Sequence, residues 1–292
     1  MNLRKITSLL IVMGLSASLN LVGCGASETG KVTDDMTNNK LNIVVSILPQ
    51  ADLVKMVGGE KVDVTVMIPP GANPDSFEPS TGDLKMLSKA DLYIQVGHLP
   101  FEKAWEERIL SANHDLVLVN SSEGIEVIDH DPHIWLSPQL AKIQIDNICQ
   151  ALINADEKNK DYYLNNLEKA LEKLSAIDKQ IADIFADHKG KTFLVYHPAW
   201  GYLAKDYGLI EMAIEDHGKE PSPGEMAEII RTAKEKGIAT VFTSPQHSTR
   251  SAEAIAKELD AKVVSLDPLP AKYEDLIEVA RLISAAMEGV NE

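Results

Sequence analysis

One long helical pattern divides the chain into two parts. Apolar residues recur at intervals of three or four positions from Leu164 to Ile184, which places them on one face of an α-helix. A helix over 156–187 is predicted, ended by Gly190, and at about 1.5 Å per residue it is roughly 45 Å long. A connector of that length is about as long as a lobe, so the pattern indicates two lobes joined by one rigid element.

On both sides of this helix, short β-rich runs alternate with amphipathic segments. The strands expected are 41–47, 61–68, 91–96, 192–196, 209–214, 239–242 and 262–265. The helices expected are 50–57, 82–89, 101–111, 222–236, 249–259 and 273–287. Such alternation is typical of parallel sheets covered by helices. The sequence therefore predicts an α/β fold with two parallel-sheet lobes, 41–155 and 190–292, joined by a helical linker over 156–189.

The N-terminus has the layout of an export signal. Residues 1–23 contain a basic start, an apolar stretch and no acidic residue, which predicts a secretory signal peptide. The apolar stretch is short and interrupted for a membrane span. It ends in Leu-Val-Gly before Cys24, and this resembles a bacterial lipobox, in which the cysteine is lipidated. We expect residues 24–40, which are polar, to form a flexible lipidated tether that holds the protein at the extracytoplasmic face of the bacterial cell membrane.

The charge balance narrows the classes of ligand. The 292 residues include 28 Lys and Arg against 44 Asp and Glu, for a formal net charge of −16. A surface of this sign repels nucleic acid and anionic lipid and favours cations as ligands.

Two histidines and one aspartate lie where a cation site is expected. His197 and Asp267 each follow directly after an apolar strand pattern, and His133 lies in a loop segment, DPHIWL. In parallel sheets, ligands bind beyond the carboxyl ends of the strands. Zinc takes about four nitrogen, oxygen or sulfur ligands. Taken singly, a histidine after a strand is explained by capping of a backbone group, and an aspartate before a proline by the start of a turn. Taken together, the three residues would supply three of the four zinc ligands.

Six short motifs extend this pattern along the chain. They are PPGANP at 69–74, FEPS at 77–80, DPHIWLSP at 131–138, HPAWGYL at 197–203, GKEPS at 218–222 and LDPL at 266–269. In this order, and over 41–287, the chain resembles the metal-specific solute-binding lipoproteins of ABC transporters that serve zinc and manganese uptake. The resemblance implies a metal site in the cleft between the lobes, delivery to an ABC permease with its ATPase, and no enzymatic activity.

The resemblance also implies a ligand set with one departure. His133, His197 and Asp267 match three of the four family ligands. The fourth is normally a histidine between Pro74 and Ser76, where this chain has Asp75. Asp75 itself could bind, since a carboxylate oxygen is a zinc ligand.

His98 is the other replacement for the fourth ligand. It follows an expected strand, in the segment GHLPFE, where the family has a short loop facing the cleft, and we prefer it slightly to Asp75. His130 and His247 are weaker candidates, whereas His114, His188 and His217 are expected at the surface.

Zinc leads as the metal because imidazole ligands suit it, whereas carboxylate-rich sites favour manganese. The family's manganese binders tend to carry glutamate where this chain has His197. Manganese and iron stay as alternatives, because coordination by Asp75 would add a second carboxylate oxygen, a hard ligand, to the site. A zinc-dependent hydrolase is a further alternative, and it needs an open coordination position and a general base. Glu215, Asp216 or Glu220 could supply that base, although no His-Glu-x-x-His pattern is present.

Overall fold

The computed structural model describes residues 40–216, 218–248 and 250–288. The predicted signal peptide, Cys24 and all of the predicted tether except residue 40 lie outside the described residues. All of these described residues belong to one compact unit, which contains both lobes. Within the described part of the chain, no helix combines the length and the apolar character needed to cross a membrane.

The N-terminal lobe is built on a parallel sheet with the strand order β2-β1-β3-β4. Its strands are β1 (Leu41–Val45), β2 (Val62–Val66), β3 (Leu92–Gln95) and β4 (Val117–Asn120). Its helices are α1 (Leu48–Gly58), α2 (Thr81–Leu87), α3 (Pro100–Ala112) and α4 (Pro138–Ala155). Every residue of β3 is buried, as expected for a central strand of a sheet covered by helices on both faces.

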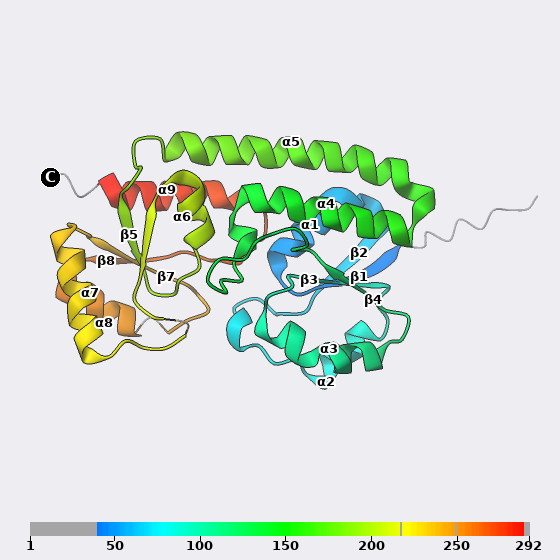
Figure 1. The fold of residues 1–292 in the computed structure, drawn as a ribbon, viewed down its shortest axis with the longest axis horizontal. Helices are drawn as coiled ribbons and strands as arrows, with labels where there is room; N and C mark the ends of the chain where they lie inside the picture. The colour runs from blue at the N-terminus through cyan, green and yellow to red at the C-terminus, as the bar shows by residue number, and fades with distance from the viewer. Residues whose placement is uncertain (1–39, 217, 249, 289–292) are drawn as a thin grey trace, which may run out of the picture. The chain divides into compact units, whose positions relative to one another are not determined.

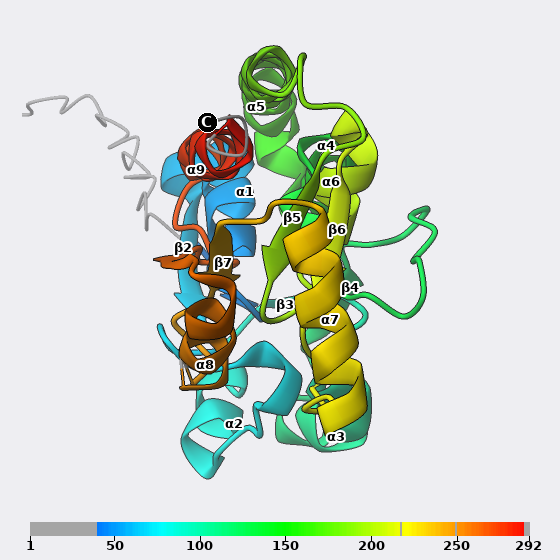
Figure 2. The ribbon, with the colours of Figure 1, turned by 90° about the vertical axis from the view of Figure 1, so that its left-hand side faces the viewer.

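The C-terminal lobe repeats this plan, with the strand order β6-β5-β7-β8 and all pairs parallel. Its strands are β5 (Thr192–Val195), β6 (Ile210–Ala213), β7 (Thr240–Thr243) and β8 (Lys262–Ser265). Its helices are α6 (Gly201–Tyr207), α7 (Pro223–Glu235), α8 (Arg250–Leu259) and α9 (Asp275–Glu288). Helices α7 and α8 lie side by side (Figure 2). The predicted pair of parallel-sheet lobes is thus confirmed.

The long helix α5 (Lys160–Ile184) joins the lobes (Figure 1). It packs against α1 and α4 of the N-terminal lobe and against α9 of the C-terminal lobe. The predicted single connecting helix is therefore present, although it is shorter than 156–187. A 3-10 turn, η4 (Glu157–Asn159), precedes it, and residues beyond Phe185 turn toward β5 instead of continuing the helix.

The buried face of α5 differs from the predicted one at its start. Tyr163 is fully buried, whereas Leu164 is 38% exposed. The Tyr163 hydroxyl donates to Asp156 Oδ2 at 2.8 Å, so a tyrosine takes the inward position. From Leu174 through Ile181 the apolar residues face the core as the spacing predicts.

Direct contacts fasten the two lobes to each other beside α5. The indole Nε1 of Trp135, which is fully buried, donates to the carbonyl oxygen of Pro268 at 2.6 Å. The backbone N–H of Tyr273 donates to Asp52 Oδ2 at 2.9 Å. A rigid helix and these cross-lobe bonds limit hinge motion between the lobes.

The topology positions polar residues along one edge of the C-terminal sheet. Strand order reverses between β5 and β7, and ligands of such sheets bind at the carboxyl ends of the strands near that reversal. Each strand end carries a polar side chain, and in spatial order these are Glu215 after β6, His197 after β5, His247 after β7 and Asp267 after β8.

Candidate metal centre

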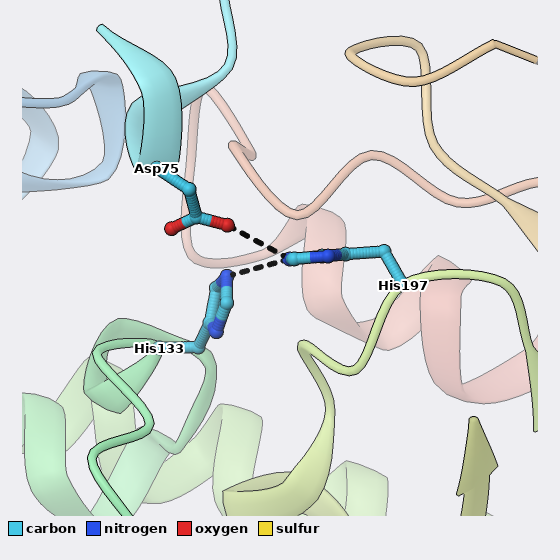
Figure 3. A group of neighbouring side chains, drawn as sticks. All are labelled: Asp75, His133 and His197. Carbon is cyan, nitrogen blue, oxygen red and sulfur yellow. Dashed lines mark hydrogen bonds and ion pairs between the residues drawn. The ribbon is translucent and has the colours of Figure 1, made fainter. Parts of the chain in front are cut away.

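Three side chains from the two lobes converge on one point (Figure 3). Asp75 lies in the 3-10 turn η2 (Pro74–Ser76), after β2. His133 directly precedes the 3-10 turn η3 (Ile134–Leu136), before α4, and His197 lies two residues past β5. One ligand atom from each lies within 4.8 Å of the other two. Both histidines are buried and Asp75 is half-buried.

The spacing of these atoms suits a small tetrahedral cation. Nε2 of His197 is 3.3 Å from Asp75 Oδ2 and 3.3 Å from His133 Nε2. Zinc bonds of about 2.0–2.2 Å in a tetrahedron put neighbouring ligand atoms about 3.3–3.6 Å apart. The two measured separations therefore match the edges of a zinc tetrahedron.

Local hydrogen bonds hold Asp75 in place. Asn73 is the N-cap of η2, and its Oδ1 accepts the backbone N–H of Asp75 at 2.8 Å. Pro74 occupies the first position of the turn, where its fixed φ costs no hydrogen bond. The turn thus presents the Asp75 carboxylate toward the histidines of the other segments.

Asp131 orients His133. Its Oδ1 lies 2.6 Å from His133 Nδ1 and also accepts the backbone N–H of His133 at 2.9 Å. A carboxylate on one ring nitrogen fixes the tautomer and leaves the other nitrogen as a metal ligand. Nε2 of His133 is accordingly the atom that faces His197.

Glu215 orients the His197 ring in the same way that Asp131 orients His133. Its Oε1 is hydrogen-bonded to His197 Nδ1, and both side chains are buried. Burial lowers the pKa of His197, but the Glu215 hydrogen bond and the charges of Asp75 and Glu215 outweigh it, so the net pKa is raised. In the metal-free protein a proton therefore competes for this ring.

Glu211 supports the segment that carries His197. Its Oε1 accepts the backbone N–H groups of Ala199 at 3.2 Å and Trp200 at 2.9 Å. Burial raises the pKa of Glu211 to about 7, partly offset by the Trp200 hydrogen bond and reinforced by the charge of Asp131. The HPAWGYL motif is therefore held by a half-buried carboxylate.

A second group of ligand atoms adjoins the first. His197, Glu215 and His247 each offer one atom within 4.8 Å of the other two. These residues, together with Asp75 and His133, line a cavity of about 730 Å³ formed by both lobes.

Asp267 and His98 do not lie among these groups. Asp267 is exposed, and its Oδ1 accepts from the backbone N–H of Leu269 at 2.9 Å and from Gln246 Nε2 at 2.8 Å. His98 lines the same cavity but is exposed, and its Nε2 is 2.9 Å from Ser122 Oγ. Their roles as ligands stay predictions.

The remaining histidines differ in placement. His130 is exposed on the cavity wall with a left-handed φ of 64°, and His114 is exposed. His188, expected at the surface, is 5% exposed because it packs beside Ser284 and Phe185. His217 lies outside the described residues.

Sequence reasoning did not identify the orienting roles of Asp131 and Glu215. Asp131 lies two residues before His133, and Glu215 follows an expected strand. The position of Asp131 near a candidate ligand, and that of Glu215 at a strand end, could have indicated a role at the site. The pairing of Glu215 with His197, however, could be predicted only by knowing that β5 and β6 are neighbours.

Comparisons with known proteins show which family the chain is similar to. Residues 43–285 match the family model described as zinc-uptake complex component A, periplasmic. The chain is 30% identical over 275 residues to the high-affinity zinc uptake system protein ZnuA of Bacillus subtilis strain 168, covering 86% of this chain and 85% of that protein.

Two further proteins show how far the likeness extends. The zinc-binding lipoprotein AdcA of Streptococcus pneumoniae serotype 4 is 28% identical over an alignment of 310 residues that covers 98% of this chain and 59% of AdcA. A crystal structure of ZnuA superposes with a TM-score of 0.82 at 38% identity, covering 85% of this chain and 99% of that one.

Proposed function

Because the chain belongs to the family of periplasmic zinc-uptake complex component A proteins, we propose that it captures a divalent transition metal, with zinc first, and delivers it to the permease of an ABC importer. The observation that carries this proposal is the convergence of Asp75, His133 and His197. These residues come from separate segments of two lobes, and their atomic separations fit one tetrahedral ion.

The donor set supports zinc over manganese. Two imidazoles and a carboxylate are ligands that zinc accepts, whereas manganese prefers sites richer in oxygen. The relatives with assigned metals are named for zinc. Manganese and iron remain the alternatives that a competition experiment decides.

The proposed setting is the extracytoplasmic face of the bacterial cell membrane. We propose that the signal peptide is removed, that Cys24 is lipidated, and that residues 24–40 tether the lobes to the membrane. The lipobox-like sequence supports this, as do the periplasmic family and the name of the lipoprotein AdcA. Permease and ATPase subunits are the proposed partners, and the acidic surface argues against nucleic acid.

Binding fits the site better than hydrolysis does. A zinc hydrolase needs a carboxylate free to act as general base beside the bound water. The two acidic residues next to the histidines, Asp131 and Glu215, are each hydrogen-bonded to an imidazole Nδ1. Their position supports a role in orienting ligands.

Calorimetric titration of the mature, metal-stripped protein with Zn²⁺ tests the proposal. We expect one saturable site that is lost in His133→Ala and His197→Ala and strongly weakened in Asp75→Ala. His114→Ala is the matched control, because His114 is exposed and is not a lining residue of the cavity. Zinc uptake that is unchanged in all three site variants would contradict the proposed ligands.

The same titration decides between the other candidate ligands. Asp267→Ala and His98→Ala each remove one of them. A loss of affinity in either variant as large as that in His133→Ala assigns the corresponding residue to the site, and competition among Zn²⁺, Mn²⁺ and Fe²⁺ ranks the metals.

A further inference from the structure

His247 lies beside the candidate metal centre, next to His197. It comes from the connection between β7 and α8, and its ring stacks on that of His197 with centroids 4.3 Å apart and an interplanar angle of 24°. Its side chain is 13% exposed, and it lines the cavity. Because β5 and β7 are neighbours in the sheet, the two histidines lie at adjacent strand ends.

Hydrogen bonds determine which nitrogen of His247 carries the proton. Asn73 uses its Oδ1 to accept the backbone N–H of Asp75, so its amide Nδ2 is the end that lies 3.1 Å from His247 Nε2. An amide NH₂ can only donate. Nε2 is therefore unprotonated, and Nδ1–H donates to Ser244 Oγ at 2.7 Å.

His133 and His197, the two buried histidines of the metal centre, share this arrangement with His247. In each of the three, Nδ1 is hydrogen-bonded to an oxygen atom, which belongs to Asp131 for His133, to Glu215 for His197 and to Ser244 for His247. Metal-binding histidines almost always bond their second nitrogen in this way. His98 differs, because its Nε2 is the atom bonded to Ser122.

The neighbouring strand end offers a weaker donor. The Asp267 side chain is exposed and lies outside the cavity lining, with Oδ1 bonded to Gln246 and Leu269. Gln246 and His247 are adjacent in sequence, so one segment places the histidine in the cavity lining and hydrogen-bonds the aspartate outside it.

We propose that His247 is the fourth ligand of the cation held by Asp75, His133 and His197, and that it binds through Nε2. This inference rests on the proposed function. On metal binding, Nε2 of His247 loses its hydrogen bond from Asn73 and coordinates the cation instead. Ser244 keeps its hydrogen bond to Nδ1 and so holds the orientation of the ring. The completed set of three imidazoles and one carboxylate suits zinc and disfavours manganese.

X-ray absorption at the zinc edge of the loaded full-length mature protein, combined with calorimetry, tests this ligand. We expect three imidazoles in the wild-type spectrum and two in His247→Phe, which retains a ring to stack on His197. Zinc affinity in His247→Phe should fall by at least about tenfold, with a stoichiometry of one. His98→Phe, the matched control on the same cavity, should keep three imidazoles and wild-type affinity.

The outcomes separate this inference from the proposed function. A wild-type spectrum with two imidazoles, or an unchanged affinity in His247→Phe, overturns the role of His247 while zinc binding stands. Loss of an imidazole in His98→Phe instead overturns it in favour of His98. If the wild-type protein takes up no zinc, both proposals fall. If His247→Phe fails to fold, the wild-type spectrum and that of His98→Phe together decide the matter, and His247→Gln gives a second variant.

Discussion

Nδ1 of His197 is hydrogen-bonded to the buried carboxylate of Glu215, which aims Nε2 at Asp75 and His133. Glu215→Gln keeps an oxygen acceptor but removes the charge that increases the basicity of the ring. Zinc affinity should fall about 10- to 100-fold, the usual effect of changing such a partner. Competition with a chelator measures the change.

Glu220→Gln is the control for that experiment. Glu220 is exposed and accepts from Tyr196 and Ser251 instead of a histidine, so its replacement should leave zinc affinity unchanged. Equal affinities of wild type and Glu215→Gln would show that Glu215 does not tune the site.

Zinc affinity should fall as the solution is acidified. Glu215 and Asp75 raise the pKa of His197 in spite of its burial, so protons begin to compete above the ordinary histidine value of about 6.5. Chelator competition from about pH 8 to about pH 5.5 should show a progressive loss. In Glu215→Gln the loss should begin at lower pH, and a flat profile in the wild-type protein would argue against histidine ligation.

Stability of the metal-free protein should fall as pH rises through neutrality. The pKa of Glu211 is raised to about 7 by burial, so the folded state holds a proton that the unfolded state releases near its ordinary value of about 4.3. The stabilisation is fully present below that unfolded value and is lost as pH rises through about 7.

Glu211→Gln removes this titration. Thermal unfolding at a series of pH values should show a flatter profile for Glu211→Gln than for wild type, with the largest gain at alkaline pH. Glu228→Gln is the exposed control on α7. Parallel profiles for wild type and Glu211→Gln would mean that Glu211 is already ionised at acidic pH.

Gly97 should not tolerate a side chain. Its φ is +96°, and a Cβ there would overlap Asn120 Oδ1, while its N–H donates to the buried Glu102 at 2.7 Å. Gly97→Ala should reduce the free energy of unfolding by about 1–3 kcal/mol or more, as measured by urea denaturation. Gly71→Ala is the control, because Gly71 has a similar φ of +82° and no atom lies within 4 Å of the added Cβ. This variant therefore measures the backbone strain alone. An equal decrease in the free energy of unfolding in both variants would exclude a contribution from the overlap with Asn120.

The sequence predicted the fold well because the apolar spacing reports burial directly. The seven expected strands correspond to β1 to β3 and β5 to β8. The four-residue strand β4 was missed because it lies at the sheet edge with Val117 52% exposed, which weakens its pattern. Helix α6 was missed because it has only seven residues and its first three, 201–203, belong to the HPAWGYL segment, which was interpreted only as a binding motif.

Sequence could place histidines at strand ends, but it could not choose among them. His197 and His133 were identified, and the structure brings their Nε2 atoms together. The choice between His98 and Asp75 stays a prediction; in the structure, Asp75 lies in the cluster and His98 is bonded to Ser122. That distinction depends on side-chain direction within loops, which hydrophobic periodicity does not encode.

An anomalous difference map collected at the zinc edge from crystals of the zinc-loaded protein would locate the bound cation between the lobes. We expect one strong peak about 2.0–2.2 Å from Nε2 of His133, Nε2 of His197 and a carboxylate oxygen of Asp75. A peak bound away from these three atoms, or no peak between the lobes, would contradict the proposed ligands.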